Sequence, residues 1–194
     1  MLSLLIELQR LKRLERTGWL LRGMPSGTES VAAHSFGVAL SAMFLADELV
    51  SKGIRVDLGR VLRMALLHDW AEARIGDMPR TAITYFGADA RQSAESAAFA
   101  DMMRGFNDGD SYQDFYQEYE QRQTLEARLV KAADVIDLLV QTLALERTGA
   151  RGLDEFWEVA RNPDFQLDAP ADQLVAGILE SLLEERRKLT IDAL

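Results

Sequence analysis

Apolar residues recur every three or four positions along most of this chain, which is the spacing typical of helices with one buried face. No stretch shows a convincing alternation of apolar and polar residues, and only four prolines interrupt the chain. The pattern predicts helices over residues 2–15, 31–50, 58–74, 89–104, 112–121, 125–146 and 171–188, with a short aromatic helix at DEFWEVA before the last. We therefore expect an all-α fold of about seven to nine helices.

The helix predicted over 58–74 carries polar side chains inside a strongly apolar stretch, VLRMALLHDWAEARIGDMP. His68 and Asp69 are adjacent, and Glu72 lies one helical turn beyond His68. An imidazole and a neighbouring carboxylate can bind one cation, with Glu72 beside it. An isolated His-Asp dipeptide is more often a core histidine satisfied by the carboxylate next to it, so the motif alone leaves both interpretations open.

The chain has only two histidines, His34 and His68, and both fall in apolar helices. That is an unusual place for surface histidines and a sensible one for ligands. Asp134 and Asp137 interrupt a later apolar helix, where carboxylates either lie at an exposed edge or reach a metal. Together with Asp69 and Asp134, the two histidines form a donor set suited to one Mn²⁺, Co²⁺, Fe²⁺, Zn²⁺, Ni²⁺ or Mg²⁺ ion.

A divalent cation held by these side chains would suit the hydrolysis of a phosphoester. It lowers the pKa of water towards about 7 in the best cases and polarises a phosphoryl oxygen. A carboxylate near the water, Glu72 or Asp77, would take the proton. A cationic side chain would hold the phosphate, and Arg16 is a candidate for this role.

Length and composition limit the kind of protein. With 194 residues and 48% hydrophobic content, the chain can bury the core of a single domain spanning residues 1–194. The absence of cysteine excludes disulfides and thiolate metal sites and fits a cytoplasmic protein. The formal net charge of −9 argues against a general nucleic-acid binder. Glu7 and Arg10 interrupt the N-terminal apolar run, so we expect no signal peptide, and no segment approaches a membrane span.

The order H…HD…D, filled by His34, His68-Asp69 and Asp134, resembles the signature of the HD-domain metal-dependent phosphohydrolases. Within that family, the stretches LKRLERTGW, RGMPSGTESVAAHS, LLHDWAEARIGDMPRTAITYF and EARLVKAAD are similar to the 5′-deoxynucleotidase branch. The resemblance covers roughly residues 9–160. It implies an HD-domain helical bundle with a metal-binding core over about residues 29–140, on which the N-terminal and C-terminal helices pack.

The resemblance also implies roles for individual residues. The side chains that would hold one divalent metal ion are His34, His68, Asp69 and Asp134. The carboxylates around the attacking water would be Glu72 and Asp77. The residues implied at or beside the substrate are Arg16, Trp19, Ser35 and Thr81. The implied reaction converts a nucleoside 5′-monophosphate, usually of a deoxyribonucleoside, to nucleoside and phosphate, and the implied assembly is a homodimer.

Two positions depart from the pattern of this branch. The residue before the first ligand, usually acidic, is Ala33, which puts in doubt a supporting contact to the site. Asp137 stands where relatives often carry glutamate or a neutral residue.

Other functions remain open on the sequence. Cyclic-nucleotide phosphodiesterases of the HD type need more histidines than this chain has. Hydrolases of the guanosine tetraphosphate alarmone share the ligand set, but they typically follow the His-Asp pair with Glu-Asp, where this chain has Glu72-Ala73. A non-catalytic helical regulatory module is a third alternative, and the intact Glu72 and Asp77 argue against it.

Overall fold

The computed structural model describes residues 1–161 and 163–191. The elements follow in the order α1 (Leu2–Leu8), the 3-10 helix η1 (Gln9–Lys12), α2 (Thr17–Leu20), α3 (Val31–Ser51), α4 (Leu58–Leu67), α5 (Glu72–Ile75), α6 (Arg80–Phe86), α7 (Ala88–Met103), α8 (Gly109–Gln121), α9 (Leu125–Arg147), α10 (Asp154–Arg161) and α11 (Ala171–Ile191). Within these residues, nine α-helices have seven or more residues and there is no β-strand. The expected all-α fold is confirmed.

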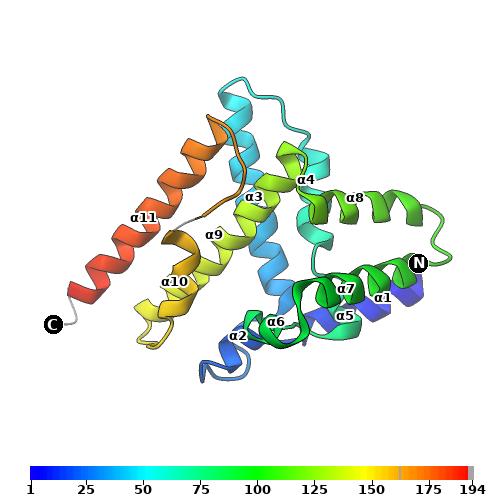
Figure 1. Cartoon of the computed structure of the whole chain (residues 1–194), viewed down its shortest axis with the longest axis horizontal. Coiled ribbons are helices and arrows are strands. Elements are labelled where there is room, and N and C mark those ends of the chain that lie inside the picture. Colours follow the sequence, from blue (N-terminus) through cyan, green and yellow to red (C-terminus); the bar gives the residue numbers. More distant parts are fainter. Residues whose placement is uncertain (162, 192–194) are drawn as a thin grey trace.

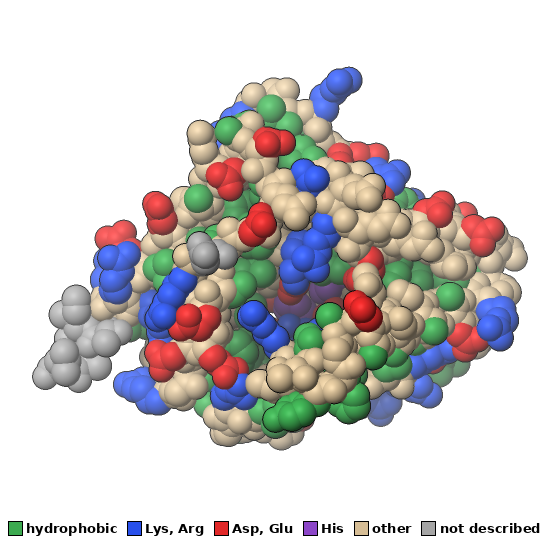
Figure 2. All heavy atoms as spheres, viewed as in Figure 1, with side chains coloured by type: hydrophobic (Ala, Val, Ile, Leu, Met, Phe, Trp, Pro, Cys, Tyr) green, Lys and Arg blue, Asp and Glu red, His purple; other side chains and the backbone are tan. Residues whose placement is uncertain are grey.

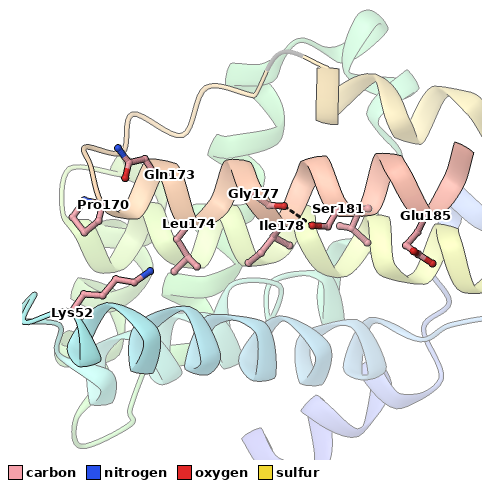
Figure 3. A pocket seen from close by; sticks show the side chains of 9 residues that line it. Lys52, Pro170, Gln173, Leu174, Gly177, Ile178, Ser181 and Glu185 are labelled. Carbon is pink, nitrogen blue, oxygen red and sulfur yellow. Dashed lines mark hydrogen bonds between the residues drawn. The ribbon is translucent and has the colours of Figure 1, made fainter.

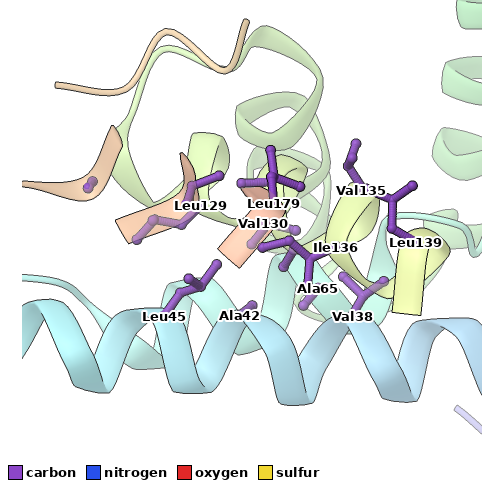
Figure 4. Close-up of a cluster of buried hydrophobic side chains, with 14 of the residues drawn as sticks. Val38, Ala42, Leu45, Ala65, Leu129, Val130, Val135, Ile136, Leu139 and Leu179 are labelled. Carbon is purple, nitrogen blue, oxygen red and sulfur yellow. The ribbon is translucent and has the colours of Figure 1, made fainter. Parts of the chain in front are cut away.

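The centre of the molecule is the crossing of α3 and α9, against which α4 packs (Figure 1). Buried aliphatic side chains fill this crossing, because the helical periodicity of both segments places them on one face. Val38 and Ala42 of α3 face Ile136 and Leu139 of α9, and Ala65 of α4 joins them (Figure 4). α11 packs on α9 and also contacts α3, and its buried side chains belong to the same cluster.

A second buried cluster lies between η1, α5, α7 and α8 and contains most of the aromatic packing. Phe99 of α7 stacks on Tyr116 of α8 with ring centroids 4.2 Å apart. Leu67, at the end of α4, is buried in the same cluster. The two clusters therefore flank α4, and the end of that helix lies between them.

The helix expected over 58–74 is broken after Leu67, at the His-Asp pair. His68 N donates to the Met64 carbonyl in the α-helical manner, but Trp70 N and Glu72 N donate to carbonyls only three residues back. These tighter turns change the direction of the chain before α5 begins. The periodicity of the apolar residues continues through the break, which is why the pattern predicted one helix.

Two segments expected as loops contain short helices. The stretch before α3 includes the single turn α2, and the connection after Pro79 forms α6. Pro79 precedes the first residue of α6, where the fixed φ of a proline is compatible with a helix start. Gly87 separates α6 from α7 with φ +85°, a conformation that glycine adopts without strain.

Among the described residues, one helix, α3, is long and apolar enough to cross a membrane by length and composition. Helices of protein cores pass the same test. Val38, Ala42 and Leu49 of α3 are fully buried against other helices of this chain, whereas Phe36, Phe44 and Val50 of the same helix are exposed.

Candidate functional site

The expected metal ligands come from three helices that meet beside the α3–α9 crossing. His34 lies in the first turn of α3, where Ser30 caps the helix by accepting from Ala33 N. His68 and Asp69 lie in the turns that follow α4, and Asp134 projects from α9. The structure brings all four together.

Each histidine is held in one orientation by a hydrogen bond at Nδ1. The His34 Nδ1 atom lies 2.8 Å from Asp137 Oδ2, and the His68 Nδ1 atom lies 2.8 Å from the Ala65 carbonyl oxygen. Since a carbonyl and an ionised carboxylate only accept, Nδ1 carries the proton in both rings. When such a ring is neutral, as binding of a metal ion requires, its Nε2 atom is a free acceptor.

Both Nε2 atoms are buried and have no hydrogen-bond partner among the described residues. His34 Nε2 lies 3.1 Å from Asp134 Oδ1, and His68 Nε2 lies 3.2 Å from Asp69 Oδ2. Buried nitrogens without partners are rare in folded proteins and need an explanation. Two imidazole lone pairs beside two carboxylates are a donor set that a divalent cation would satisfy.

The electrostatics of the cluster suit a cation. Burial would raise the pKa of Asp69, but His68 and Arg16 beside it hold that pKa well below its usual range. Burial likewise opposes ionisation of Asp134, and Lys131 and His34 lower its pKa. Both carboxylates are therefore ionised at neutral pH.

The pKa of His34 shifts upward, in the opposite direction to the pKa values of Asp69 and Asp134. Burial and the charge of Arg16 disfavour its protonated form, but the adjacent carboxylates of Asp134 and Asp137 outweigh them. They raise the pKa of His34 to about 9. At neutral pH a proton thus partly compensates the carboxylates, in the place where a metal ion would do so.

The two expected catalytic carboxylates lie next to this cluster. Glu72 is 3% exposed, and its Oε2 atom has no hydrogen-bond partner among the described residues. Burial and the negative charges of Asp69 and Asp77 raise the pKa of Glu72 well above its usual value. Asp77 accepts a hydrogen bond from Thr17 N, which fixes it beside Arg16.

Arg16 reaches the cluster from the turn before α2. Its Nη1 atom lies 3.3 Å from Asp69 Oδ2 and 3.7 Å from Asp77 Oδ1. These carboxylates raise the pKa of Arg16 against the effect of burial, so the guanidinium stays charged. Arg16, Asp69 and Asp77 line a cavity of about 510 Å³, a size typical of small-ligand sites.

The remaining expected substrate contacts fall in different places. Trp19 is buried and lines the cavity; its ring centroid lies 4.5 Å from that of Phe156, and its Nε1 donates a hydrogen bond to Glu29 Oε2. Ser35 does not line the cavity, and its hydroxyl donates to the Val31 carbonyl within α3. Thr81 is exposed on α6 and does not line the cavity either.

The structure also shows what supports the first ligand. Ala33 is exposed, so an acidic residue at that position would point away from His34 in this fold. The supporting carboxylate is Asp137, 103 residues along the chain. The sequence marked Asp137 as a departure and gave no signal of this contact, because α3 and α9 meet only in the folded chain.

A second hollow, of about 690 Å³, lies between α3 and α11 (Figure 3). Three of its four polar side chains are already engaged: Lys52 pairs with Glu48, the Ser181 hydroxyl donates to the Gly177 carbonyl, and Glu185 pairs with Arg147 and Lys188. Leu174 and the other apolar residues make up most of the lining. The residues that line this hollow include no histidine and only one carboxylate, in contrast to the cluster around His34 and His68.

Fold and site together define a class: all-helical proteins that place two histidines and two aspartates around one cation site, beside a cavity with a buried arginine. The chain belongs to the HD domain family, whose model matches residues 8–163. The resemblance drawn from the sequence is thereby confirmed.

Relatives and solved structures agree with this assignment. The 5′-deoxynucleotidase HDDC2 of Xenopus laevis is 31% identical over 144 residues, covering 73% of this chain and 67% of that protein. The 5′-deoxynucleotidase hdd1 of Schizosaccharomyces pombe is 28% identical over 190 residues, with coverage of 93% and 87%.

Among solved structures, a conserved hypothetical protein from Pyrococcus furiosus matches with a TM-score of 0.81 at 34% identity, covering 95% of this chain and 99% of that one. An HD-domain phosphohydrolase from Listeria innocua has the same fold, with a TM-score of 0.65 at 22% identity over 84% of this chain and 85% of that one.

Proposed function

We propose that this protein is a metal-dependent phosphohydrolase that converts nucleoside 5′-monophosphates, preferentially deoxyribonucleotides, to nucleoside and phosphate. The observation that carries the proposal is the convergence of two unpartnered histidine Nε2 atoms on Asp69 and Asp134, next to the cavity that Arg16 lines. The names of the relatives, 5′-deoxynucleotidases of several organisms, support the substrate class.

The residues that would hold one divalent ion are His34, His68, Asp69 and Asp134. Such an ion supplies Lewis acidity to the phosphoryl oxygen and acidifies water. Which metal ion binds depends on the metals available in the cell, because this donor set accepts several divalent metals.

The chain's own residues supply the rest. Arg16 binds the substrate phosphate, for which a guanidinium offers two parallel donors. Glu72 accepts the proton of the attacking water, and its raised pKa makes it a stronger base than an exposed glutamate. Asp77 holds Arg16 in place between substrate encounters. Trp19 and Phe156 offer an apolar wall for the nucleoside.

The residue that follows Glu72 argues against the alternative that the protein is an alarmone hydrolase. Ala73 is 7% exposed and packs in the second apolar cluster, away from the cavity. A second carboxylate at this position would be buried among apolar side chains, at a cost of several kcal/mol unless paired, on the order given for buried polar groups.

The test is phosphate release from deoxyribo- and ribonucleoside 5′-monophosphates and the alarmone, using metal-stripped protein restored with Mn²⁺ or Co²⁺. We expect metal-dependent turnover that favours the deoxy compounds and that Asp69→Ala abolishes. Turnover of the alarmone alone would replace the proposal, and no turnover of any compound with either metal would overturn it.

Two substitutions separate binding from chemistry. Arg16→Ala should raise KM most, because it removes a phosphate contact present in the ground state and the transition state. Glu72→Ala should reduce kcat by about 10²–10⁴-fold, the range for a general base, with metal content unchanged. Normal turnover in Glu72→Ala would contradict the role of this carboxylate.

We further propose a cytoplasmic homodimer, as the resemblance to the 5′-deoxynucleotidase branch implies. Light scattering should then give twice the chain mass of 21.7 kDa. A monomeric mass would contradict the proposal without affecting the assignment of the site.

A further inference from the structure

The outer face of α3 carries a stripe of large apolar side chains. Phe36, Leu40 and Phe44 follow one another at intervals of four residues, so they share one side of the helix. Phe36 is 64% exposed, Phe44 is 63% exposed, and Leu40 between them is 36% exposed. Single exposed apolar residues are normal on a protein surface, whereas a contiguous exposed apolar patch marks an interaction site.

The stripe lies on the side of α3 that faces away from the metal ligands. Phe36 comes two residues after His34 and therefore projects about 200° round the helix axis from it. Figure 2 shows histidine side chains in a hollow on one face of the molecule. A partner that covered the stripe would leave this hollow open to substrate.

Opposite charges flank the two ends of the stripe. Asp47 is exposed one turn beyond the last phenylalanine. At the other end, Lys12 and Arg13 are exposed at the end of η1. They lie beside the start of α3, because Val31 N donates to the Leu14 carbonyl at 2.8 Å. None of these three charges makes an ion pair or a side-chain hydrogen bond with another residue that the structure describes.

The acidic side chains next to these positions are engaged within the chain. Glu48 Oε1 lies 3.0 Å from Lys52 Nζ. The Glu15 carboxylate accepts from the Ser26 hydroxyl and from Gly27 N. The three unpaired charges at the ends of the stripe are therefore available to a partner.

A second copy of the chain fits both the stripe and its ends. In a dimer with two-fold symmetry, residue i of one copy meets residue j of the other, and j meets i. With Leu40 on the axis and the two α3 helices antiparallel, Phe36 meets Phe44 of the second copy. The same register brings Asp47 to the start of the second α3, where the two unpaired cations lie.

We propose that the outer face of α3 is the interface of a homodimer, in which the α3 helices of two copies pack antiparallel about Leu40. The inference rests on the proposed homodimer and adds where its interface lies. Phenylalanines form the apolar centre and the charges form a polar rim, as in protein interfaces generally. The two phenylalanines offer roughly 250 Å² per copy, against the ~800 Å² that each partner contributes to a standard interface, so the contact extends onto the helices beside α3.

The charge pair at the rim forms only between copies. Asp47 lies fourteen residues beyond Ala33, so the helical rise places it about 21 Å from the start of α3 in its own chain. This separation exceeds the Debye length of about 8 Å at physiological ionic strength, which screens the two ends from each other. A charge reversal at one end that is compensated at the other end therefore reports a contact between chains.

Sedimentation at a series of protein concentrations measures the dissociation constant of the dimer. Leu40→Glu should raise this constant by about 30-fold or more, the range for loss of a central anchor, because two carboxylates would meet on the axis. Phe86→Glu is the matched control. Phe86 is 66% exposed on α6, and this variant should dimerise as the wild type does. Thermal unfolding of both variants shows that a monomer is a folded one.

Charge reversal tests the rim. Asp47→Lys should raise the dissociation constant by about three- to tenfold, because each exposed ion pair contributes little and the symmetry repeats it twice. Adding Lys12→Glu and Arg13→Glu to the same chain should restore the wild-type value. Asp110→Lys, at an exposed position of α8, is the control for reversal of one charge and should leave the constant unchanged.

Cross-linking tests the register. The chain has no cysteine, so one introduced thiol reports on the symmetry axis. Leu40→Cys should form a covalent dimer with a short bismaleimide, because both copies of residue 40 lie at the axis. Ala33→Cys should not, because seven residues on each side of the axis place its two copies about 21 Å apart. Phe86→Cys should also stay uncross-linked.

The outcomes separate this inference from the proposed function. A wild-type dimer that persists in Leu40→Glu, or whose Leu40→Cys variant gives no covalent dimer, overturns the interface. Loss of the dimer in Leu5→Glu but not in Leu40→Glu would place the interface on α1, where Leu5 is 52% exposed, and also overturns it. A wild type that stays monomeric overturns the homodimer and its interface together. Phosphate release from a nucleoside 5′-monophosphate, measured on the same samples, decides the phosphohydrolase separately.

Discussion

Asp137 is the side chain that decides how His34 presents its free nitrogen. Its Oδ2 atom lies 2.8 Å from His34 Nδ1, and the neighbouring backbone leaves room for it only because residue 37 is glycine. A Cβ at Gly37 would lie 1.9 Å from Asp137 Oδ1, so the carboxylate would have to move. A carboxylate behind a metal-binding histidine fixes the ring and raises its basicity.

We therefore predict that Asp137→Ala weakens Mn²⁺ binding by about 10–100-fold, the range for loss of such supporting contacts. Gly37→Ala should have the same effect by displacing Asp137. Gly177→Ala is the matched control, because a Cβ there meets nothing within 4 Å. Titration calorimetry of the metal measures all three, and wild-type affinity in Gly37→Ala would show that Asp137 does not support the site.

The proton on His34 gives metal binding a pH dependence. Asp134 and Asp137 raise the pKa of His34 to about 9, so below that pH the metal-free protein carries a proton that a cation must displace. Affinity for Mn²⁺ should rise by about tenfold per pH unit from 7 towards 9 and then level off. Calorimetry in buffers of different ionisation enthalpy should report release of about one proton at pH 7, and a pH-independent affinity over this range would contradict the prediction.

At the scale of elements, the site depends on how α3 packs on α9, because these helices carry His34 on one side and Asp134 with Asp137 on the other. Leu139 is fully buried at this crossing, whereas its neighbour Val140 is 47% exposed. Leu139→Ala should lower the free energy of unfolding by about 2–5 kcal/mol, as for other buried leucines.

Val140→Ala is the control for Leu139→Ala and should cost no more than about 0.5 kcal/mol, because it lies on the surface of the same helix. Denaturant unfolding of the metal-free protein measures both. Equal losses in the two variants would mean that the crossing of α3 and α9 is not the core that positions the ligands.

The elements also show where sequence patterns succeed and fail. Apolar periodicity located α3, α7, α8, α9 and α11 because each buries one continuous face. It missed the break at His68 because the apolar spacing runs on through the tight turns. The four expected ligands follow from an ordered motif, whereas the contact of Asp137 with His34 joins residues 103 positions apart, which no local pattern encodes.

At the scale of the whole molecule, binding of a metal ion at this site is thermodynamically coupled to folding of the chain. Asp69, Asp134 and Glu72 bring carboxyl groups into the interior of a protein with net charge −9, and Arg16 and a proton on His34 compensate them only in part. An ion that binds the folded chain and not the unfolded one stabilises it by RT ln(1 + [L]/Kd), about 2.7 kcal/mol at one hundred times Kd.

We predict that saturating Mn²⁺ raises the melting temperature of the metal-stripped protein by several degrees, on the scale of about 2–4 °C per kcal/mol for a chain of this size. Asp69→Ala should abolish the shift, because one of the two carboxylate ligands is lost, and Asp101→Ala should retain it. Asp101 pairs with Arg74 on the surface, outside the cavity, and so serves as the control for loss of one negative charge. Scanning calorimetry with and without a chelator makes the comparison, and an equal shift in Asp69→Ala would mean that Mn²⁺ stabilises the fold from somewhere other than this site.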